Sequence, residues 1–150
     1  MKIYLDNCCF NRPFDNQSQM TVKLESDAKL FIQDLVKQGR VHLLWSFMLD
    51  FENSANPFKD RREWIFKWEY YAKENIVLNK TITEYSEQLT ALSFKKKDAV
   101  HISCAIAGNS EYFITTDKGI LNKKDKIKDI RISDPIEFVK IWEEKNAGRY

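Results

Sequence analysis

The sequence predicts a single α/β domain over residues 1–150, with a short, mostly parallel sheet and helices on both of its faces. A length of 150 residues matches the commonest size of one domain, and a hydrophobic content of 43% provides one sizeable core. Short continuous apolar runs alternate with longer amphipathic stretches, a pattern typical of parallel strands that helices cover on both sides. No Ser/Gly-rich linker or internal repeat interrupts this alternation.

The first part of the chain gives the clearest elements. Lys2–Leu5 is a short apolar run that stops abruptly at Asp6, so it predicts a strand with an acid at its carboxyl end. The polar stretch 11–21 opens with the turn signal Asn-Arg-Pro and is expected to be a loop. Thr21–Gln38 has apolar residues at helical spacing, and Gly39 is well suited to end that helix.

The middle of the chain continues the alternation. Val41–Trp45 is expected to be a second buried strand, and Ser46 can cap a short helix over Phe47–Ser54. Pro57–Glu74 is expected to form one helix, because its aromatic residues recur at helical spacing.

The rest of the chain repeats the pattern with shorter strands. Lys97–Ala107 is apolar nearly all round, which predicts a buried helix. Pro135 stands at a favoured first position of the closing helix. The other expected elements are a weak strand or turn at Ile76–Leu78, a helix at Thr81–Leu92, a strand at Tyr112–Thr115, a helical turn near Leu121, a strand at Ile130–Ile132 and the closing helix Pro135–Lys145.

Composition excludes several classes of protein. The chain is too apolar for disorder, and it is neither collagen-like nor rich in disulfides. An acid at position 6 precedes any apolar core of a signal peptide, and the longest uncharged run, 99–110, is far shorter than the ~20 residues that span a bilayer. We therefore expect a cytoplasmic protein that does not contact membranes. The four glycines form no phosphate-binding loop, which excludes Rossmann and P-loop cofactor sites.

Three cysteines stand at positions 8, 9 and 104 and form no CxxC pair. A zinc site that combines them with His42 and His101 lacks the usual ligand spacing. We expect the cysteines to be small buried hydrophobic side chains.

Four acids stand where the carboxyl ends of parallel strands are expected to meet. Asp6 and Asp117 directly follow strands, whereas Glu52 and Asp98 lie on the helices after the second strand and at the start of the buried helix. Ligands of open parallel sheets bind at this edge. Clustered carboxylates repel one another, and Mg²⁺ or Mn²⁺, which prefer oxygen ligands, supply the counter-charge.

Each acid also has a simpler role open to it. Asp98 can favour the helix dipole, and Asp117 can cap the turn that follows it. Asp50 competes with Glu52 for the position near the site. A simpler structural role is harder to assign to Asp6, since an acid that continues a buried strand is costly without a partner.

Four segments, in this order, resemble the PIN domain, the nuclease fold of VapC-type toxins: MKIYLDNCCFNRPFDNQ, SFMLDFEN, KKDAVHISCAIA and YFITTDKGIL. The shared pattern is an apolar strand ending in Asp, a Ser followed six residues later by Glu, an Asp-Ala-x-His helix and a Thr-Thr-Asp strand end. The resemblance implies a Mg²⁺- or Mn²⁺-dependent endoribonuclease with metal-binding, catalytic carboxylates at Asp6, Glu52, Asp98 and Asp117. The Ser-to-Glu spacing favours Glu52 over Asp50.

The resemblance also implies partners. Such proteins cleave RNA, many are homodimers, and many are the toxin of a toxin–antitoxin pair neutralised by a small antitoxin protein. The sequence departs from the family pattern at Cys8, at the Phe51–Asn53 context of the acid and at Ser103. None of these departures removes a carboxylate, so they indicate a divergent branch.

Lysines flank the expected site. Between positions 95 and 128 there are eight lysines and four acids, a local sum of +4 in a chain whose net charge is +2. A phosphate backbone requires such basic flanks, although a solvated lysine face is the simpler alternative. The expected nucleic-acid contacts are Arg12, Lys95, Lys96, Lys97 and Lys118, and the expected supporting residues are Asn7, Thr115 and Thr116.

Each of two further features is open to two interpretations. The aromatic face of Trp64, Trp68 and Tyr71 is expected to pack in the core, with a dimer or antitoxin surface as the alternative. His101 lies one turn from Asp98 and is expected to be a satisfied core histidine in preference to a general base.

Two other functions compete with the nuclease. A catalytically silent PIN-like module could bind RNA or protein, but all four carboxylates are retained. An aspartyl phosphotransfer protein is the weaker alternative, because Asp6-Asn7-Cys8 lacks the second acid that a haloacid-dehalogenase-type site needs.

Overall fold

The computed structural model describes residues 1–147, so the last three positions of the predicted 1–150 domain lie outside the described residues. Five strands form one all-parallel sheet in the order β3-β2-β1-β4-β5, which confirms the predicted α/β class. The strands are β1 (Lys2–Leu5), β2 (His42–Ser46), β3 (Glu74–Ile76), β4 (Tyr112–Ile114) and β5 (Arg131–Ser133).

Eight α-helices and three 3₁₀ turns connect the strands within the described residues. The α-helices are α1 (Asn7–Asn11), α2 (Met20–Lys37), α3 (Phe47–Ser54), α4 (Lys59–Phe66), α5 (Lys80–Ala91), α6 (Lys96–Ala107), α7 (Lys118–Leu121) and α8 (Pro135–Lys145). The 3₁₀ turns are η1 (Arg12–Phe14), η2 (Lys67–Tyr71) and η3 (Lys124–Lys126). Across positions 1–147, every helix is too short or too polar to cross a membrane.

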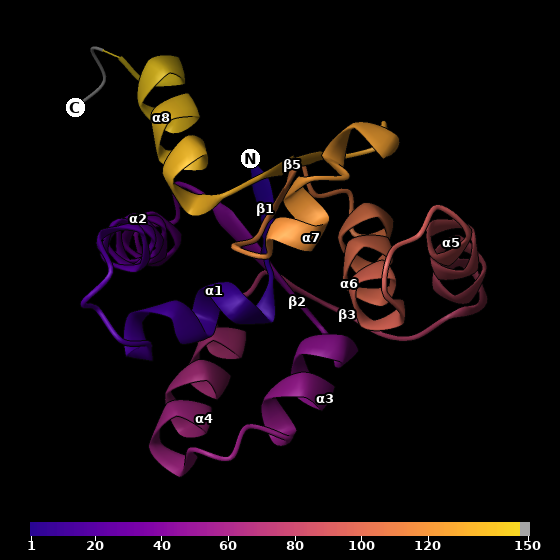
Figure 1. Cartoon of the computed structure of the whole chain (residues 1–150), viewed down its shortest axis with the longest axis horizontal. Coiled ribbons are helices and arrows are strands. Elements are labelled where there is room, and N and C mark those ends of the chain that lie inside the picture. The colour runs from indigo at the N-terminus through magenta and orange to yellow at the C-terminus, as the bar shows by residue number, and fades with distance from the viewer. Residues whose placement is uncertain (148–150) are drawn as a thin grey trace.

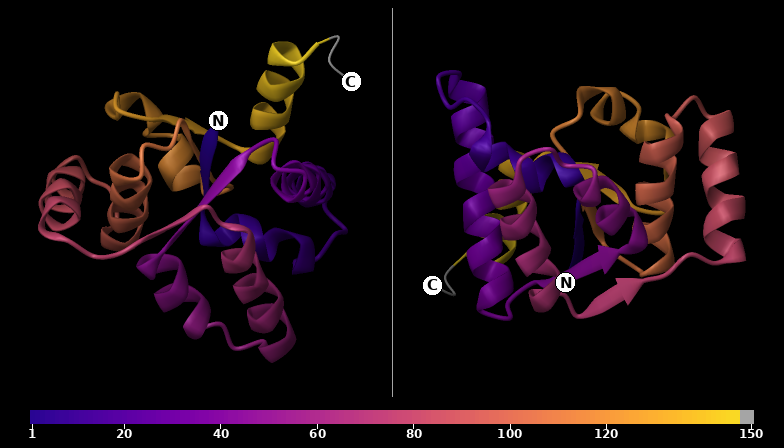
Figure 2. Two further views of the ribbon diagram at one scale, coloured as in Figure 1. Left: turned by 180° about the vertical axis from the view of Figure 1, so that it is seen from behind. Right: turned by 90° about the horizontal axis from the view of Figure 1, so that it is seen from below.

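The chain order of the strands places a topological switch point next to β1. The chain runs outward from β1 to β2 and β3, then returns to pair β4 with the other side of β1 and continues to β5. Because right-handed crossovers that run in opposite directions place their helices on opposite faces, the reversal after β3 changes the face: Figure 1 shows α2 and α8 on one side of the sheet and α6 on the other. Figure 2 shows α5 stacked outside α6. A crevice opens between β1 and β4 at the carboxyl edge of such a sheet.

Aromatic side chains fill the core on both faces of the sheet. Tyr4 of β1 stacks on Phe113 of β4 with ring centroids 5.4 Å apart, and Trp45 of β2 meets the edge of Phe10 at 5.5 Å. All four side chains are fully buried. Burial of each such side chain contributes about 1.5–3 kcal/mol, so these contacts hold the three central strands rigidly together.

Helix α1 differs from the expectation, which placed no helix before residue 21. The Asp6 carboxylate accepts a hydrogen bond from the Asn7 backbone N–H at 2.8 Å and caps the helix. Cys9 and Phe10 of α1 are buried in the core, and η1 extends the helical path to Phe14. The missed helix results from the packing of these two apolar side chains. Within the expected loop 11–21, the turn signal Asn-Arg-Pro coincides with the start of η1, and α2 begins at Met20.

The predicted single helix Pro57–Glu74 is also wrong, because it divides into α4 and η2. The tighter η2 turn packs Trp68 inward, where the ammonium groups of Lys29 and Lys37 lie 5.5 and 5.4 Å from its ring centroid. Trp68 is 6% exposed, whereas Trp64 is 54% exposed. The aromatic residues therefore do not share one buried face as expected.

Gly39 ends helix α2 as the sequence predicts. Its φ of +72° lies in the left-handed region, and its N–H donates to the Val36 carbonyl oxygen at 3.0 Å. The turn delivers the chain directly into β2, next to β1.

Candidate metal-binding site

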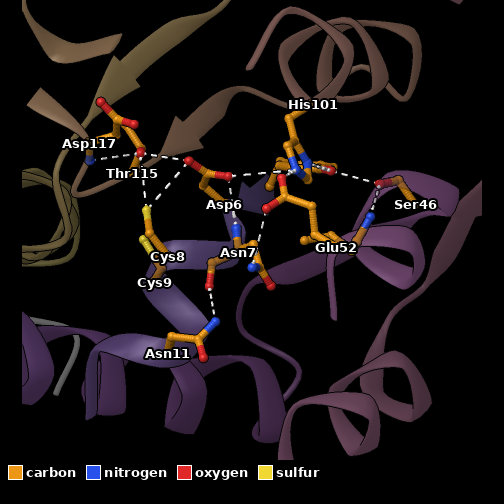
Figure 3. Close-up of polar contacts among 12 residues, drawn as sticks. Asp6, Asn7, Cys8, Cys9, Asn11, Ser46, Glu52, His101, Thr115 and Asp117 are labelled. Carbon is orange, nitrogen blue, oxygen red and sulfur yellow. Dashed lines mark hydrogen bonds and ion pairs between the residues drawn. The ribbon is translucent and has the colours of Figure 1, made fainter. Parts of the chain in front are cut away.

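The acids predicted from the sequence lie at the carboxyl edge of the sheet, around the switch point. Asp6 directly follows β1, and Thr115 and Asp117 follow β4, the strand that pairs with β1. Glu52 reaches the same edge from α3, as Figure 3 shows. The order of the strands in the sheet therefore brings side chains that are more than a hundred positions apart in the sequence into one site.

Asp6 is the most buried of the four acids, with 6% of its surface exposed. One carboxylate oxygen, Oδ1, caps α1, and the other, Oδ2, accepts a hydrogen bond from the Thr115 hydroxyl at 2.8 Å. The Asp117 backbone N–H donates to that hydroxyl oxygen at 3.0 Å, so Asp6 and the end of β4 are tied together. Asp6 is thus held in a fixed orientation, as a metal ligand requires.

Glu52 is held from the opposite side by a buried chain of hydrogen bonds. His101 Nε2 contacts Glu52 Oε1 closely, and His101 Nδ1 lies 2.6 Å from the Tyr4 hydroxyl. The Tyr4 hydroxyl in turn lies 2.7 Å from Ser46 Oγ. Because a carboxylate only accepts, we assign the Nε2 proton of His101 to the bond with Glu52.

The hydrogen-bond chain favours the ionised form of Glu52. Burial alone would raise the pKa of Glu52, but the hydrogen bond and positive charge of His101, together with the charge of Lys97, outweigh it and lower the pKa below its ordinary value. Asp50, the competing acid, points elsewhere and accepts a hydrogen bond from the Trp45 indole at 2.8 Å. Glu52 is therefore the acid of α3 that reaches the site.

Asp98 adds a third negative charge. Burial, followed by the charges of Asp6 and Asp117, raises the pKa of Asp98 to about 6. Positive charge on His101 opposes this rise. Asp98 also lies in the first turn of α6, so the helix-dipole role expected for it holds as well. The charges of Asp6 and Asp117 therefore act repulsively on Asp98, and a cation would relieve this repulsion.

Asp117 caps a helix and also acts electrostatically on another acid of the site. Its Oδ1 caps α7 by accepting hydrogen bonds from the N–H groups of Gly119 at 2.7 Å and Ile120 at 3.4 Å. Its charge nevertheless acts on Asp98. Asp117 thus belongs to the acidic cluster while it fixes the loop after β4.

The donor atoms fit a divalent cation. Asp6 and Glu52 each offer a carboxylate oxygen, and these two oxygens and a ring nitrogen of His101 lie within 4.8 Å of one another. Because His101 Nε2 donates its proton to Glu52, the two carboxylates are the ligands for the ion. Two buried oxygens of adjoining residues have no hydrogen-bond partner: Oδ1 of Asn7, which follows Asp6, and Oγ1 of Thr116, which precedes Asp117. A buried amide oxygen without a donor is costly, and coordination of a cation would satisfy it.

Two side chains of this site were not expected there. His101 was expected to be a satisfied core histidine, and it is fully buried and hydrogen-bonded, but it also contacts Glu52. Cys8 is half-buried, unlike Cys9 and Cys104, and its Sγ lies 3.4 Å from both Asp6 Oδ2 and Thr115 Oγ1. The helical spacing of Asp98 and His101 was the available signal for the first, and the position of Cys8 two residues after Asp6 for the second.

Comparisons with known proteins agree with this geometry at the level of the fold. No protein-family model and no curated protein matches the chain. A chain in the crystal structure of VapBC2 from Rickettsia felis, bound to a DNA fragment from its promoter, superposes with a TM-score of 0.57 over 89% of this chain and 98% of its own, at 16% identity. A chain of VapBC-1 from nontypeable Haemophilus influenzae gives a TM-score of 0.59 over 90% and 98%, at 14% identity.

This chain has a PIN-like fold. The resemblance noted in the sequence is thereby confirmed for the architecture, while the low identity leaves activity to be argued from the site. In this PIN-like domain the buried switch-point acids are the feature to explain.

The predicted nucleic-acid contacts of the PIN-like domain fall into two groups. Lys95–Lys97 and Lys118 are exposed at the starts of α6 and α7, the helices that carry or follow Asp98 and Asp117. Arg12 instead pairs with Asp15 at 3.2 Å and with Glu25 at 3.5 Å, and it is half-buried. These ion pairs hold η1 against α2. Because the guanidinium of Arg12 is engaged within the protein, we do not propose it as a nucleic-acid contact.

Replacing His101 with Phe is expected to lower the free energy of unfolding by about 2–3 kcal/mol, because the Tyr4 hydroxyl and Glu52 lose their buried partner. The pKa of Glu52 should rise at the same time. Urea unfolding and NMR titration of Glu52 measure the two effects. His42→Phe on the exposed end of β2 is the control, and an unchanged Glu52 pKa in His101→Phe would contradict the assigned hydrogen bond.

Proposed function

We propose that this protein is a divalent-metal-dependent endoribonuclease and the toxin of a toxin–antitoxin pair. The observation that carries the proposal is the convergence of Asp6, Glu52 and His101 within 4.8 Å. The pKa of Asp98, raised by burial and then by the charges of Asp6 and Asp117, supports it. Asp6 and Asp117 also cap helices, but capping does not require these acids to lie where their charges act on Asp98. A bound cation would offset this repulsion.

Mg²⁺ or Mn²⁺ suits the donor set best, because carboxylate and amide oxygens predominate. Asp6 and Glu52 would hold the ion, with Asp98 and Asp117 completing its surroundings. When bound, such an ion lowers the pKa of water and stabilises charge on a phosphodiester oxygen.

The remaining residues of the site position these groups. Thr115 fixes one oxygen of Asp6, and Asn7 Nδ2 donates to Glu52 Oε2 at 3.4 Å. His101 is a positioning residue that keeps Glu52 ionised and oriented. Hydrolysis in line at phosphorus would leave 5′-phosphate and 3′-hydroxyl ends, as the PIN resemblance implies.

RNA is the proposed substrate, and the exposed lysines before Asp98 and after Asp117 are its proposed phosphate contacts. An RNA substrate is consistent with a cytoplasmic location. The structural neighbours come from VapBC complexes, which supports a small antitoxin as a partner of this chain. A homodimer belongs to the same proposal.

RNA cleavage in the presence of Mn²⁺, Mg²⁺ or EDTA tests the proposal. We expect single-stranded RNA to be cut with either ion and left intact with EDTA. RNA that binds but is never cut, with any of these ions, would favour the catalytically silent binding module.

Replacing Lys95, Lys96 and Lys97 together with Gln is expected to weaken RNA binding and to reduce the slope of log affinity against log salt by roughly 2–3, about one per lost phosphate contact. Fluorescence anisotropy at several salt concentrations, in an Asp6→Asn background that leaves RNA uncut, measures both. A triple Gln variant of Lys59, Lys80 and Lys140, exposed on α4, α5 and α8, is the control. Equal slopes in the two triple variants would show a merely solvated lysine face.

A further inference from the structure

The amino edge of the sheet, opposite the edge that carries the acids, has a polar hollow of its own. Strands β4 and β5 begin at this edge with Tyr112 and Arg131, which are partners in the parallel register. Lys145, in the last turn of α8, reaches the same place. These three side chains line the hollow together with Ser110, which lies between α6 and β4.

Two cations converge on the hydroxyl group of Tyr112, a residue that is only 1% exposed. Arg131 Nη1 donates to the hydroxyl oxygen at 3.2 Å, and Lys145 Nζ donates to it at 3.5 Å. The same two cationic groups lie 5.9 and 5.6 Å from the centroid of the Tyr112 ring. A hydroxyl group is neutral, so two positive charges are gathered at one point without a negative charge between them.

The hydroxyl group of Ser110 is buried and has no hydrogen-bond partner. Ser110 is 6% exposed, and its Oγ neither donates nor accepts a hydrogen bond among residues 1–147. Its backbone is fixed, because the Ser110 N–H donates to the Ala105 carbonyl oxygen at 3.0 Å. A buried hydroxyl without a partner is costly, and a ligand in the hollow would satisfy it.

The charges that line the hollow favour an anion. Its cations are Lys128, Arg131 and Lys145, and none of them forms an ion pair in the part of the chain that the structure describes. Two acids line it as well, but Asp129 is engaged by the hydroxyl of Tyr85. Glu111 is thus the remaining acid that opposes three unpaired cations.

We propose that this hollow binds a phosphate group, with Arg131 and Lys145 as its charged donors and the hydroxyls of Tyr112 and Ser110 as its neutral donors. The Tyr112 proton is available, because no acceptor takes it within residues 1–147. A phosphate group offers several acceptor oxygens and up to two negative charges, which matches two cations and two hydroxyls better than a single carboxylate does. Neither the metal nor RNA is needed for this binding, so its failure would leave the proposed nuclease untouched.

An adjoining hollow offers space for an organic group attached to the phosphate. It shares Tyr112 and Arg131 with the first hollow, and Ile127, Ile132 and Ile141 give it an apolar lining. Free phosphate and a small phosphate ester therefore share the same proposed contacts, and the experiment has to tell them apart.

The test titrates metal-free protein with sodium phosphate, 5′-AMP or sodium acetate at constant ionic strength, in the presence of EDTA. Binding is followed by NMR shifts of the Ser110 and Tyr112 amides and of the Arg131 Nε group. We expect phosphate to bind at least tenfold more tightly than acetate. The phosphate affinity should fall at least tenfold in Arg131→Gln and in Lys145→Gln, and about threefold in Tyr112→Phe. Lys140→Gln, exposed on the same helix as Lys145 but outside the hollow, is the matched control and should bind as the wild type does.

The 5′-AMP titration distinguishes the two sources of phosphate. Tighter binding of 5′-AMP than of phosphate, with shifts of the Ile127 and Ile141 methyl groups, assigns the site to an ester, whereas equal or weaker binding assigns it to free phosphate. Three results would overturn the proposal. They are equal affinity for phosphate and acetate, unchanged phosphate affinity in both Arg131→Gln and Lys145→Gln, and shifts confined to Lys95–Lys97, which would place the phosphate on the proposed RNA surface.

Discussion

Replacing Asp6 with Asn is expected to lower RNA cleavage by about a thousandfold and to leave the fold intact. Asp6 is the most buried acid of the cluster and contributes one of the two carboxylates that would hold the ion. Loss of its charge removes several kcal/mol of metal-dependent stabilisation, and each 1.36 kcal/mol corresponds to a factor of ten in rate. Asn keeps an oxygen that can cap α1, so the N-terminus of that helix should persist.

Initial rates of cleavage of a fluorescent RNA with saturating Mn²⁺ measure this effect. Asp125→Asn, an exposed acid of η3 outside the site, is the matched control and should cleave at the wild-type rate. Circular dichroism establishes that both variants fold. Wild-type activity in folded Asp6→Asn would exclude Asp6 as a metal ligand.

In metal-free protein at pH 7.5, replacing Asp98 with Asn is expected to raise the free energy of unfolding by about 1–2 kcal/mol. The pKa of Asp98 is raised to about 6 in the folded state, by burial and then by the charges of Asp6 and Asp117, from an ordinary value of 3.8. The unfolded chain therefore ionises more easily, and the folded state loses stability as pH rises from about 4 through 6. Asn removes that penalty, so the gain should be present at pH 7.5 and absent at pH 3.5.

Glu52→Gln provides the opposite sign within the same cluster. The pKa of Glu52 is lowered in the folded state, so its charge stabilises the fold above an ordinary pKa of 4.5, and that contribution is lost as pH falls. Urea unfolding with EDTA at pH 3.5 and 7.5 measures both variants. If Asp98→Asn and Glu52→Gln changed stability in the same direction at pH 7.5, the assigned electrostatics of the site would be contradicted.

The regular part of the fold was predictable because its signals are local. Lys2–Leu5 is a strand in the structure as in the sequence pattern, and Phe47–Ser54 is a helix capped by Ser46 through a hydrogen bond from the Leu49 N–H. The acids could be placed at one edge because parallel strands order their carboxyl ends without any knowledge of side-chain contacts.

The features that were missed depend on contacts between distant residues. Helix α1 is stabilised by burial of Cys9 and Phe10, and the local sequence gives no sign of this burial. The pairing of His101 with Glu52 joins residues 49 positions apart, and only the packing of α3 against α6 brings them together. Arg12 looked free in the sequence, and its partner Glu25 lies 13 positions further along the chain.

The aromatic segment Trp64–Tyr71 was also predicted incorrectly from its local spacing. Helical spacing predicted a buried face, but the change to a 3₁₀ turn at Lys67 rotates Trp68 inward and leaves Tyr70 and Tyr71 exposed.

The central claim is that the switch-point acids bind a divalent cation. Diffraction from crystals soaked in Mn²⁺, collected at the manganese absorption edge, tests this claim most directly. We expect an anomalous peak within about 2.5 Å of carboxylate oxygens of both Asp6 and Glu52, and no such peak in Asp6→Asn crystals. Fully soaked wild-type crystals with no peak at these two carboxylates would contradict it.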